Sequence, residues 1–391
     1  ILFLAHRTPF PPDRGDKIRG YHILKHLAAR ARVHLIAFAE DDRDLAVPDD
    51  LLASATIVPR AKPMWRAGLE ALAAGKPVSL TAFEDAALAE AVRTVLARQP
   101  IETIWCFSSQ MAQYLPAGGE YRLVMDFCDV DSAKFAQYGR EGSGPKALMM
   151  RREGRLLLAH DRAVAERVDA SLFVSAAEAA LFEDLTGAPR VSALPNGIDT
   201  VRFDPAADFA AVEAGPGPLA VFTGQMDYAP NVAAVDWFAR EILPLVRHQH
   251  PAARLAIVGR APTAEIQALA DLPGVTVTGE VADVRGWLAA ADVVVVPLKL
   301  ARGVQNKVLE AMAMARPVVA SGAAAEGIDH NGTIRVGADA AAIAGACSDL
   351  IADPAAADAL GKAARARAIA HYGWDAALAP IDSILSADSV R

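Results

Sequence analysis

The sequence predicts an α/β fold with two Rossmann-like domains, each built on a doubly wound parallel sheet. Short apolar or β-branched runs alternate with longer amphipathic stretches along the chain, as strands and helices do in such sheets. The pattern starts again near Leu219, after a segment at 204–218 that is rich in Ala, Gly and Pro and reads as a linker. A chain of 391 residues is long enough for two separate cores.

The expected elements follow from this alternation. Strands are predicted at 1–5, 33–39, 55–58, 103–106, 122–126 and 171–174, with helices at 17–31, 86–98 and 151–167. The second set comprises strands at 219–223, 254–258, 275–278, 293–297, 317–320 and 333–336 and helices at 232–248, 264–270, 284–290, 306–314 and 340–351. A short helix at 378–385 follows. Ligands of open α/β sheets bind at the carboxyl ends of strands, so the loops after these strands are where chemistry is expected.

The composition restricts the class of protein. Hydrophobic residues make up 53 % and charged residues 22 % of the chain, which is typical of a globular protein. The net charge of −8 argues against a nucleic-acid-binding protein, so no nucleic-acid partner is expected. The three cysteines, Cys106, Cys128 and Cys347, form no metal-type pair and are expected to be buried thiols in a reducing compartment. No run of 18 apolar residues and no signal peptide is visible, so we expect a cytoplasmic protein.

The segment 297–319 carries the strongest functional pattern. A strand ends at Pro297, a loop containing Gly303 follows, and a helix begins near Gln305, so that its backbone N–H groups suit a diphosphate. Lys307 in the first turn opposes the helix dipole, which indicates an anionic ligand. Glu310 lies one turn further on the same face, where a carboxylate can accept both hydroxyls of a ribose. The alternative is an ordinary Lys–Glu pair on a helix surface.

This segment resembles the donor site of glycosyltransferase family 4, whose fold is GT-B. The likeness rests on Glu310, the Ala-Met-Ala that follows it and the Pro-Val-Val strand at 317–319. Further support comes from the Ser that ends 169–175 and from Asn-Gly-Ile-Asp at 196–199. The resemblance implies an interdomain cleft, an N-terminal acceptor-binding domain at 1–203, a C-terminal nucleotide-sugar domain at 204–375, and a helix at 376–391 that packs back on the first domain.

The resemblance also assigns residues. Glu310 matches the ribose-binding Glu, whereas the family's other Glu, eight positions earlier, is Arg302 here, and Arg302 is a candidate for the diphosphate. No basic residue lies between Gly224 and Asn231, so Arg260 and Lys307 are the expected partners of the leaving diphosphate. Backbone groups around Val281 are expected at the base, unless 278–284 is a plain connection with Asp283 as the helix N-cap. The donor-binding prediction comprises Gly15, Gly224, Arg260, Val281, Arg302, Gly303, Lys307 and Glu310.

The N-terminal half supplies the acceptor prediction. Gly15, Lys17 and Arg19 match the loop that abuts donor phosphate and acceptor in family 4, unless the prolines at 9–12 make a structural turn only. Asp126, Asp129 and Asp131 follow a strand that faces the cleft. Three readings stay open for them: acceptor binding or catalysis, with Asp126 as base; helix capping and structure; or a metal site. Catalysis is thus assigned to Lys307, Arg260 and Asp126, acceptor binding to Lys17, Arg19, Asp129 and Asp131, and no metal or other cofactor is expected, because the GT-B fold works without one.

The sequences of the segments 9–19 and 124–134 further resemble those of the sugar transferases of bacterial PEP-CTERM/exosortase systems, which act in exopolysaccharide biosynthesis. The expected reaction is therefore retaining transfer of a sugar from a nucleotide-diphosphate donor to a glycan acceptor, with a lipid-linked acceptor favoured. Two basic, Met-containing segments at 62–66 and 146–152 provide either peripheral membrane contact or ordinary packing. The alternatives to a transferase are a non-catalytic nucleotide-sugar-binding or scaffold protein, and an epimerase or hydrolase on the same fold.

Overall fold

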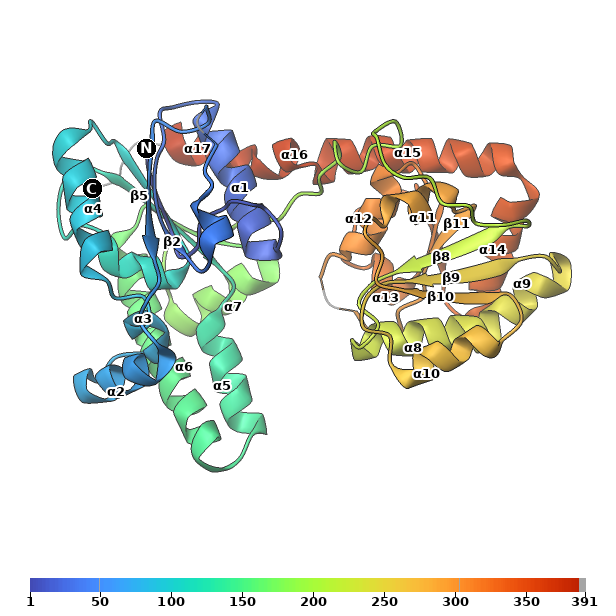
Figure 1. The fold of residues 1–391 in the computed structure, drawn as a ribbon, viewed down its shortest axis with the longest axis horizontal. Helices are drawn as coiled ribbons and strands as arrows, with labels where there is room; N and C mark the ends of the chain where they lie inside the picture. The colour runs from blue at the N-terminus through green and yellow to red at the C-terminus, as the bar shows by residue number, and fades with distance from the viewer. Residues whose placement is uncertain (49, 302, 387–391) are drawn as a thin grey trace. The chain divides into compact units, whose positions relative to one another are not determined.

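The computed structural model describes residues 1–48, 50–301 and 303–386. The chain divides into two compact units, one formed by Ile1–Asn196 together with the chain from Ala377 onward, the other by Gly197–Ala376 (Figure 1). The sequence-based boundary at residue 203 therefore falls inside the second unit, and the short C-terminal helix belongs to the first.

The first unit is built on a seven-stranded sheet in the order β3-β2-β1-β4-β5-β6-β7, in which every pair of neighbours is parallel. Its strands are β1 Leu2–Ala5, β2 His34–Ala39, β3 Ser54–Pro59, β4 Thr103–Phe107, β5 Arg122–Cys128, β6 Ala170–Phe173 and β7 Val191–Ala193. Its α-helices are α1 Gly15–Ala28, α2 Met64–Ala74, α3 Val78–Thr81, α4 Ala86–Arg98, α5 Asp131–Glu141, α6 Gly144–Arg167, α7 Ala176–Thr186 and α17 Pro380–Ser386, with two short 3-10 helices at Asp42–Leu45 and Ser109–Tyr114.

The second unit carries a six-stranded parallel sheet in the order β10-β9-β8-β11-β12-β13. Its strands are β8 Leu219–Thr223, β9 Arg254–Val258, β10 Val275–Gly279, β11 Val293–Val296, β12 Val318–Ser321 and β13 Arg335–Gly337. Its helices are α8 Ala229–Trp237, α9 Leu243–Gln249, α10 Ala264–Gln267, α11 Arg285–Ala290, α12 Asn306–Ala313, α13 Gly322–Ala325, α14 Ala340–Ala352 and α15 Pro354–Tyr372, with a π-helical turn at Phe238–Ile242 and a 3-10 turn at Ala268–Asp271. Helix α16, Trp374–Leu378, begins in this unit and ends in the first.

Both sheets bury their central strands on both faces, which explains why those strands are continuous apolar runs in the sequence. All four valines of β11 are buried, as are all five residues of β8. The strand order reverses between β1 and β4 in the first sheet and between β8 and β11 in the second. In doubly wound sheets such a reversal opens a crevice at the carboxyl ends of the strands, and that crevice positions a ligand.

The helix predicted at 232–248 was expected to be continuous, and the structure corrects this. It is divided into α8, the π-helical turn Phe238–Ile242 and α9. Pro244 lies in the first turn of α9 and has no N–H to donate to the preceding turn, so the regular α-helical ladder is interrupted there.

The segment 204–218, predicted as a linker, packs within the second unit instead. The Arg254 guanidinium donates hydrogen bonds to the backbone carbonyls of Ala214, Gly215 and Gly217. At the other end of the segment, Asp204 pairs with Arg365 of α15 at 2.6 Å. Arginine side chains from elsewhere in the fold hold the backbone of this Ala-, Gly- and Pro-rich segment in place. The composition of the segment does not reveal these contacts.

Within the described residues, none of the helices taken singly has both the length and the apolar composition of a membrane span. One bent pair, Ala340–Ala352 with Pro354–Tyr372, meets those criteria jointly at an angle of 108°.

Candidate functional site

A pocket of about 440 Å³ lies at the carboxyl ends of β8 and β9 and at the first turn of α12 in the second unit. This is the crevice that the strand order of that sheet creates. The pocket is lined by Thr223, Gly224, Gln225, Asn231, Val258, Gly259, Arg260, Glu280, Val281, Val284, Asn306, Lys307 and Glu310. The structure thus brings together Gly224, Arg260, Val281, Lys307 and Glu310, five residues of the donor-binding prediction.

Two glycines let the ends of β8 and β9 approach each other at the pocket floor. The Gly224 N–H donates to the Val258 carbonyl at 3.0 Å. Gly259 has a φ of 155°, and a Cβ there would lie 1.6 Å from the Gly224 carbonyl oxygen. A Cβ at Gly224 would in turn lie 3.0 Å from Lys307 Nζ and 2.8 Å from Asn231 Nδ2. Any side chain at these positions would therefore displace the groups that form the site.

Lys307 carries the main positive charge of the pocket floor. Its Nζ donates to Asn231 Oδ1 at 2.5 Å and lies 4.2 Å from the centre of the Phe222 ring. Burial lowers the pKa of Lys307 to about 8, and the nearby Glu310 carboxylate offsets part of that lowering. In the described part of the chain, Lys307 forms no ion pair within 4.0 Å. An ammonium group held by a neutral amide and an aromatic face keeps its charge available for an anion.

Asn231 is a site residue that the sequence interpretation used only as the end of a loop. Its side chain is 6 % exposed, accepts from Lys307, and donates through Nδ2 to the Gln225 carbonyl at 2.9 Å. It therefore fixes Lys307 relative to the loop after β8. The sequence does contain an indication of this role: Asn231 is a poor helix former, yet it stands in the first turn of α8, directly after Pro230.

Glu310 lies one turn after Lys307 on α12 and lines the same pocket. Burial raises the pKa of its carboxyl group, while Lys307 and Arg202 act in the opposite direction. A half-buried carboxylate of this kind is suited to accept hydrogen bonds from the two hydroxyls of a ribose.

Arg260 adds a second positive charge at the mouth of the pocket. It is exposed, and its guanidinium donates to Gln225 Oε1 at 3.0 Å. The predicted base-reading segment around Val281 lies along the same pocket, next to Glu280. Asp283 accepts from the Arg285 N–H at 2.9 Å, but the N-cap of α11 is Val284, so the predicted N-cap position is one residue too early.

Two further members of the donor-binding prediction, Gly303 and Gly15, do not line this pocket. Gly303 adopts a φ of 64° in the loop before α12, a conformation that favours glycine, but it is not a lining residue. Arg302 lies outside the described residues. Gly15 belongs to the other unit, where a Cβ would meet nothing within 4 Å.

In the first unit, the predicted acceptor residue Arg19 and the predicted base Asp126 form a buried ion pair. Arg19 Nε and a terminal nitrogen lie 3.0 and 3.1 Å from the two oxygens of Asp126, and the side chains are 2 % and 0 % exposed. Arg19 also donates to the Leu194 carbonyl and to Asn196 Oδ1, each at 2.8 Å. This placement favours the structural interpretation of both residues, because neither offers an accessible group to a substrate within its own unit.

The remaining acceptor residues are also paired within the protein. Lys17 is 4 % exposed and donates to the buried Asp44 carboxylate. Asp129 and Asp131 share the Lys134 ammonium at 2.8 and 3.3 Å on the surface. Acceptor contact by these side chains stays a prediction. Over the residues that the structure describes, no three His, Cys, Asp or Glu side chains are grouped so as to hold a metal ion.

His6 is a titratable residue at the carboxyl end of β1 that the sequence interpretation missed. Its Nε2 lies 3.3 Å from Asp16 Oδ2, and its ring stacks on Phe107 at 5.7 Å between centres. Burial alone raises the pKa of Asp16, but hydrogen bonds with His6 and Arg7 hold it well below its usual range. The signal was a His directly after a buried strand, at the position where ligands of such sheets bind.

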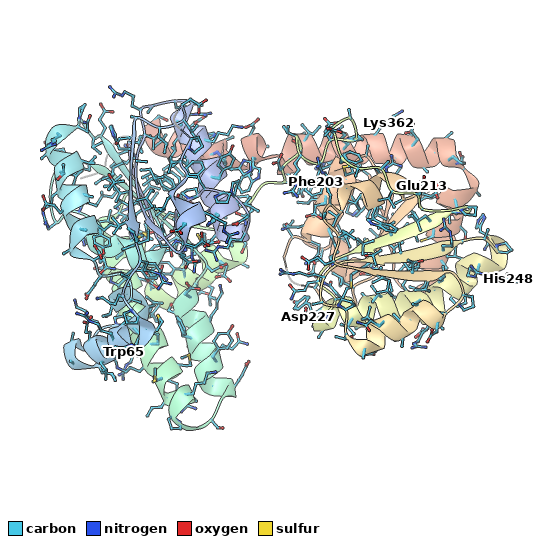
Figure 2. The ribbon with its side chains drawn as sticks, viewed as in Figure 1. Trp65, Phe203, Glu213, Asp227, His248 and Lys362 are labelled. Carbon is cyan, nitrogen blue, oxygen red and sulfur yellow. The ribbon has the colours of Figure 1, made fainter. Side chains whose placement is uncertain are left out.

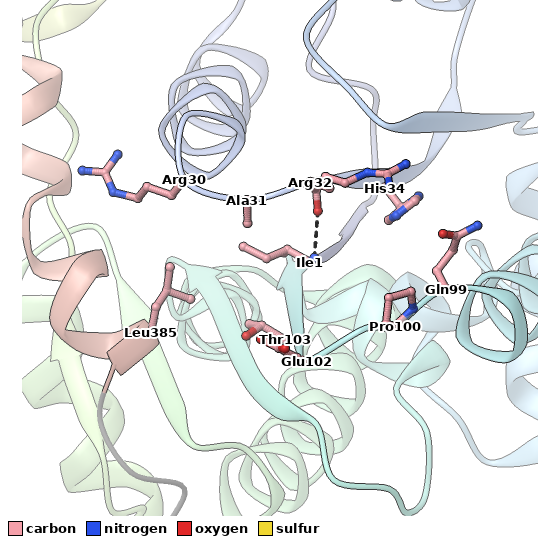
Figure 3. Close-up of a pocket in the computed structure, with 10 residues that line it drawn as sticks. All are labelled: Ile1, Arg30, Ala31, Arg32, His34, Gln99, Pro100, Glu102, Thr103 and Leu385. Atoms are coloured by element: carbon pink, nitrogen blue, oxygen red, sulfur yellow. Dashed lines mark hydrogen bonds between the residues drawn. The ribbon is translucent and has the colours of Figure 1, made fainter.

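A second pocket, of about 330 Å³, lies in the first unit, at the amino ends of the strands of its sheet (Figure 3). It is lined by Ile1, His34 and Thr103 at the amino ends of β1, β2 and β4, together with residues such as Arg32 and Glu102. The Ile1 amino group donates to the Arg32 carbonyl at 2.9 Å in this pocket. The amino ends of strands in such sheets do not position ligands, so we assign the functional site to the pocket in the second unit.

Comparison with known proteins is consistent with this assignment. Residues 217–353, which include the pocket, match the family model described as Glycosyl transferases group 1. A curated relative from Mycolicibacterium smegmatis, the GDP-mannose-dependent alpha-(1-6)-phosphatidylinositol monomannoside mannosyltransferase, is 32 % identical over 250 residues, covering 58 % of this chain and 64 % of the relative. This chain thus spans about 64 % of the length of that relative.

Solved structures resemble the chain over its whole length. Sucrose-phosphate synthase from Thermosynechococcus elongatus aligns over 98 % of both chains with a TM-score of 0.61 at 20 % identity. The structure of Anabaena HepE in complex with UDP aligns over 98 % of this chain and 99 % of that chain with a TM-score of 0.61 at 16 % identity. The predicted fold class, GT-B with two Rossmann-like domains, is thereby confirmed, and residues 217–353 carry the sequence pattern of glycosyl transferases group 1.

Proposed function

We propose that this protein is a glycosyltransferase that transfers a sugar from a nucleoside diphosphate sugar to a glycan acceptor. The single observation that carries the proposal is the arrangement of Lys307 and Glu310. An ammonium with no ion-pair partner among the described residues and a half-buried carboxylate lie one helical turn apart in a pocket at the carboxyl ends of the strands.

The arrangement matches the chemistry of the donor. As the bond between sugar and diphosphate breaks, negative charge grows on the departing phosphate, and cationic groups that already point at it lower the barrier. Lys307 and Arg260 supply that charge, with the first backbone N–H groups of α12 beside them. Glu310 holds the ribose, and backbone groups near Val281 contact the base.

The proposal includes retention at the anomeric carbon and independence from metal ions. Both come from the family 4 resemblance of the donor segment. Lys307 and Arg260 are the groups that take the place of a divalent cation. EDTA is expected to leave the transfer rate unchanged, and a loss of rate that Mg²⁺ restores would contradict metal independence.

The acceptor side of the proposal is a lipid-linked glycan in bacterial exopolysaccharide biosynthesis, in a system of the PEP-CTERM/exosortase type. The sequence resemblance at 9–19 and 124–134 supports it. The curated relative from Mycolicibacterium smegmatis acts, by its name, on a phosphatidylinositol mannoside. The base stays open, because that relative is GDP-mannose-dependent and HepE was solved with UDP.

The decisive experiment is calorimetric titration of the full chain with GDP, UDP and their sugar derivatives, with and without Mg²⁺, followed by transfer assays with the donor that binds. Selective binding of one diphosphate that Lys307→Ala weakens, together with product formation, supports the proposal. Binding without transfer to any glycan or lipid-linked acceptor would instead favour a non-catalytic nucleotide-sugar-binding protein. If no nucleotide binds, the assignment of this pocket as the donor site is contradicted.

A further inference from the structure

Two helical segments of the first unit expose large apolar side chains. On α2, Met64, Trp65, Leu69 and Leu72 are 57–70 % exposed (Trp65 is labelled in Figure 2). On the helical hairpin formed by α5 and α6, Tyr138, Leu148 and Met149 are 50–68 % exposed. These seven side chains are called the α2–α6 surface below. Soluble monomers rarely expose large apolar patches, and such a patch marks a binding face.

The exposure of α2 is the reverse of that of an ordinary surface helix. Trp65, Leu69 and Leu72 follow the i, i+4, i+7 spacing and share one face. The residues of α2 that are buried are Ala67 and Ala71, on the other side of the helix. Normally the large apolar side chains point to the core and small or polar ones to water. The outward face of α2 is therefore built for a contact outside the unit.

Hydrogen bonds hold α2 against α6. The Arg152 guanidinium donates to the carbonyls of Ala71 and Lys76 at the end of α2, each at 3.0 Å. Glu153 accepts from the backbone N–H groups of Val78 and Ser79, each at 2.8 Å. Leu148 and Met149 precede Arg152 by about one turn of α6 and so lie on the same side of that helix. Figure 1 shows α2 and the α5–α6 hairpin extending from the same end of the unit.

The hairpin surrounds these apolar groups with positive charge. Residues 138–155 contain five basic residues, Arg140, Lys146, Arg151, Arg152 and Arg155, against two acidic ones, Glu141 and Glu153. Glu153 points inward, as its bonds to Val78 and Ser79 show. Arg140, Lys146 and Arg155 are exposed and have no ion-pair partner in the parts of the chain that the structure describes.

Charge decides which partner fits. At α2 the cations are paired, since Arg66 on the helix and Lys62 just before it both lie within ion-pair distance of Glu70. The excess positive charge of the hairpin therefore favours an anionic partner. A Trp with Leu and Met side chains beside unpaired Arg and Lys is the combination that binds the headgroup region of an anionic bilayer.

We propose that the α2–α6 surface docks this protein onto an anionic lipid bilayer. Trp65, Leu69 and Leu148 enter the headgroup region, while Arg140, Lys146 and Arg155 contact lipid phosphates. The inference deepens the proposed function, because a lipid-linked acceptor lies in such a bilayer. It is tested without donor or acceptor, so it fails or succeeds separately from the transfer reaction.

The first test is co-sedimentation of the full chain with vesicles of phosphatidylcholine alone or mixed with phosphatidylglycerol. The mixed vesicles are expected to bind the protein more tightly, and added salt to weaken that binding by screening. The double variant Trp65→Ser/Leu69→Ser should lower the partition coefficient at least about tenfold, because apolar area no longer leaves water. The matched control is Leu181→Ser/Leu185→Ser on α7, at residues 38 % and 36 % exposed, which should bind like the wild type.

The charge is tested separately with Lys146→Glu/Arg155→Glu. Each basic residue near an anionic surface contributes about fivefold in partition, so a loss of at least about 25-fold is expected on mixed vesicles. All variants are compared in nucleoside diphosphate binding, which should be unchanged if they are folded. The proposal would be overturned if the wild-type chain did not bind mixed vesicles, or if the surface variants bound them as well as the wild type. A dimer in sedimentation equilibrium that Trp65→Ser/Leu69→Ser dissociates would also overturn it, in favour of a second copy of this chain.

Discussion

The carboxyl ends of the two sheets carry charged residues that are used in different ways. In the first unit, the two oxygens of Asp126 face Arg19, and Lys17 faces Asp44, all of them almost completely buried. In the second unit, Lys307 rests on a neutral amide and an aromatic ring beside an open pocket. The carboxyl ends of two similar sheets therefore serve stability in one case and ligand binding in the other, and the charge that has no counter-ion among the described residues marks the ligand site.

The largest effect is expected from breaking the buried pair of the first unit. Arg19→Ala leaves the Asp126 carboxylate without a counter-ion in a dry environment and should lower the free energy of unfolding by about 3–5 kcal/mol. Urea-induced unfolding followed by fluorescence measures this. Lys25→Ala, at an exposed position of α1, is the control and should change it by less than about 0.5 kcal/mol. A fully stable Arg19→Ala variant would show that the pair is not structural.

Next in size is the loss of the unpaired charge in the second unit. Lys307→Ala should reduce turnover about 100-fold, as removal of a group that stabilises a developing anion does. Steady-state kinetics measures this, with Lys362→Ala on the exposed face of α15 as the control. Urea unfolding should place the stability of Lys307→Ala near that of the wild type, unlike Arg19→Ala. If Lys307→Ala turned over at the wild-type rate, Lys307 would have no role in the reaction.

A smaller effect is expected at the ribose position. Glu310→Ala should weaken donor binding by about 1–3 kcal/mol, the usual loss for a hydrogen bond to a charged group. Calorimetric titration with the nucleoside diphosphate measures this, and Glu265→Ala, exposed in the first turn of α10, serves as control. An unchanged dissociation constant for Glu310→Ala would remove the ribose role.

The smallest expected effect comes from pH. Burial lowers the pKa of Lys307 to about 8, so in the free site Lys307 loses its positive charge as the pH rises through that value. Affinity for a nucleoside diphosphate should therefore fall about tenfold between pH 7 and pH 9. Lys307→Arg should abolish this fall, because arginine stays charged. Asn231→Asp should move it to higher pH, because a carboxylate beside the ammonium favours the charged form. The same pH dependence in all three proteins would contradict the assignment to Lys307.

Much of the second unit was predictable because its signals are local. The strands Leu219–Thr223 and Arg254–Val258 agree with the predicted ranges, since a buried parallel strand is a continuous apolar run. The pairing of Lys307 with Glu310 on one helix face follows from helix geometry alone. In contrast, the edge strand β7, Val191–Ala193, is three residues long and only partly buried, and it escaped the analysis.

The roles of the N-terminal charges were not predictable in the same way. Arg19 and Asp126 lie 107 positions apart, and nothing in the local sequence of either one indicates that they neutralise each other. The same holds for Asn231 and Lys307, which lie 76 positions apart. The outward orientation of Trp65 on α2 depends on how Arg152 of α6 holds that helix.

The sequence by itself determined the α/β class, most strands and the anion-binding pattern of 297–319, because periodicity, helix termini and strand composition are properties of neighbouring residues. Only the tertiary structure decided which charges are neutralised and which remain available. That decision depends on which distant side chains the sheet order brings within hydrogen-bonding distance, and on how much water the packing removes from around them.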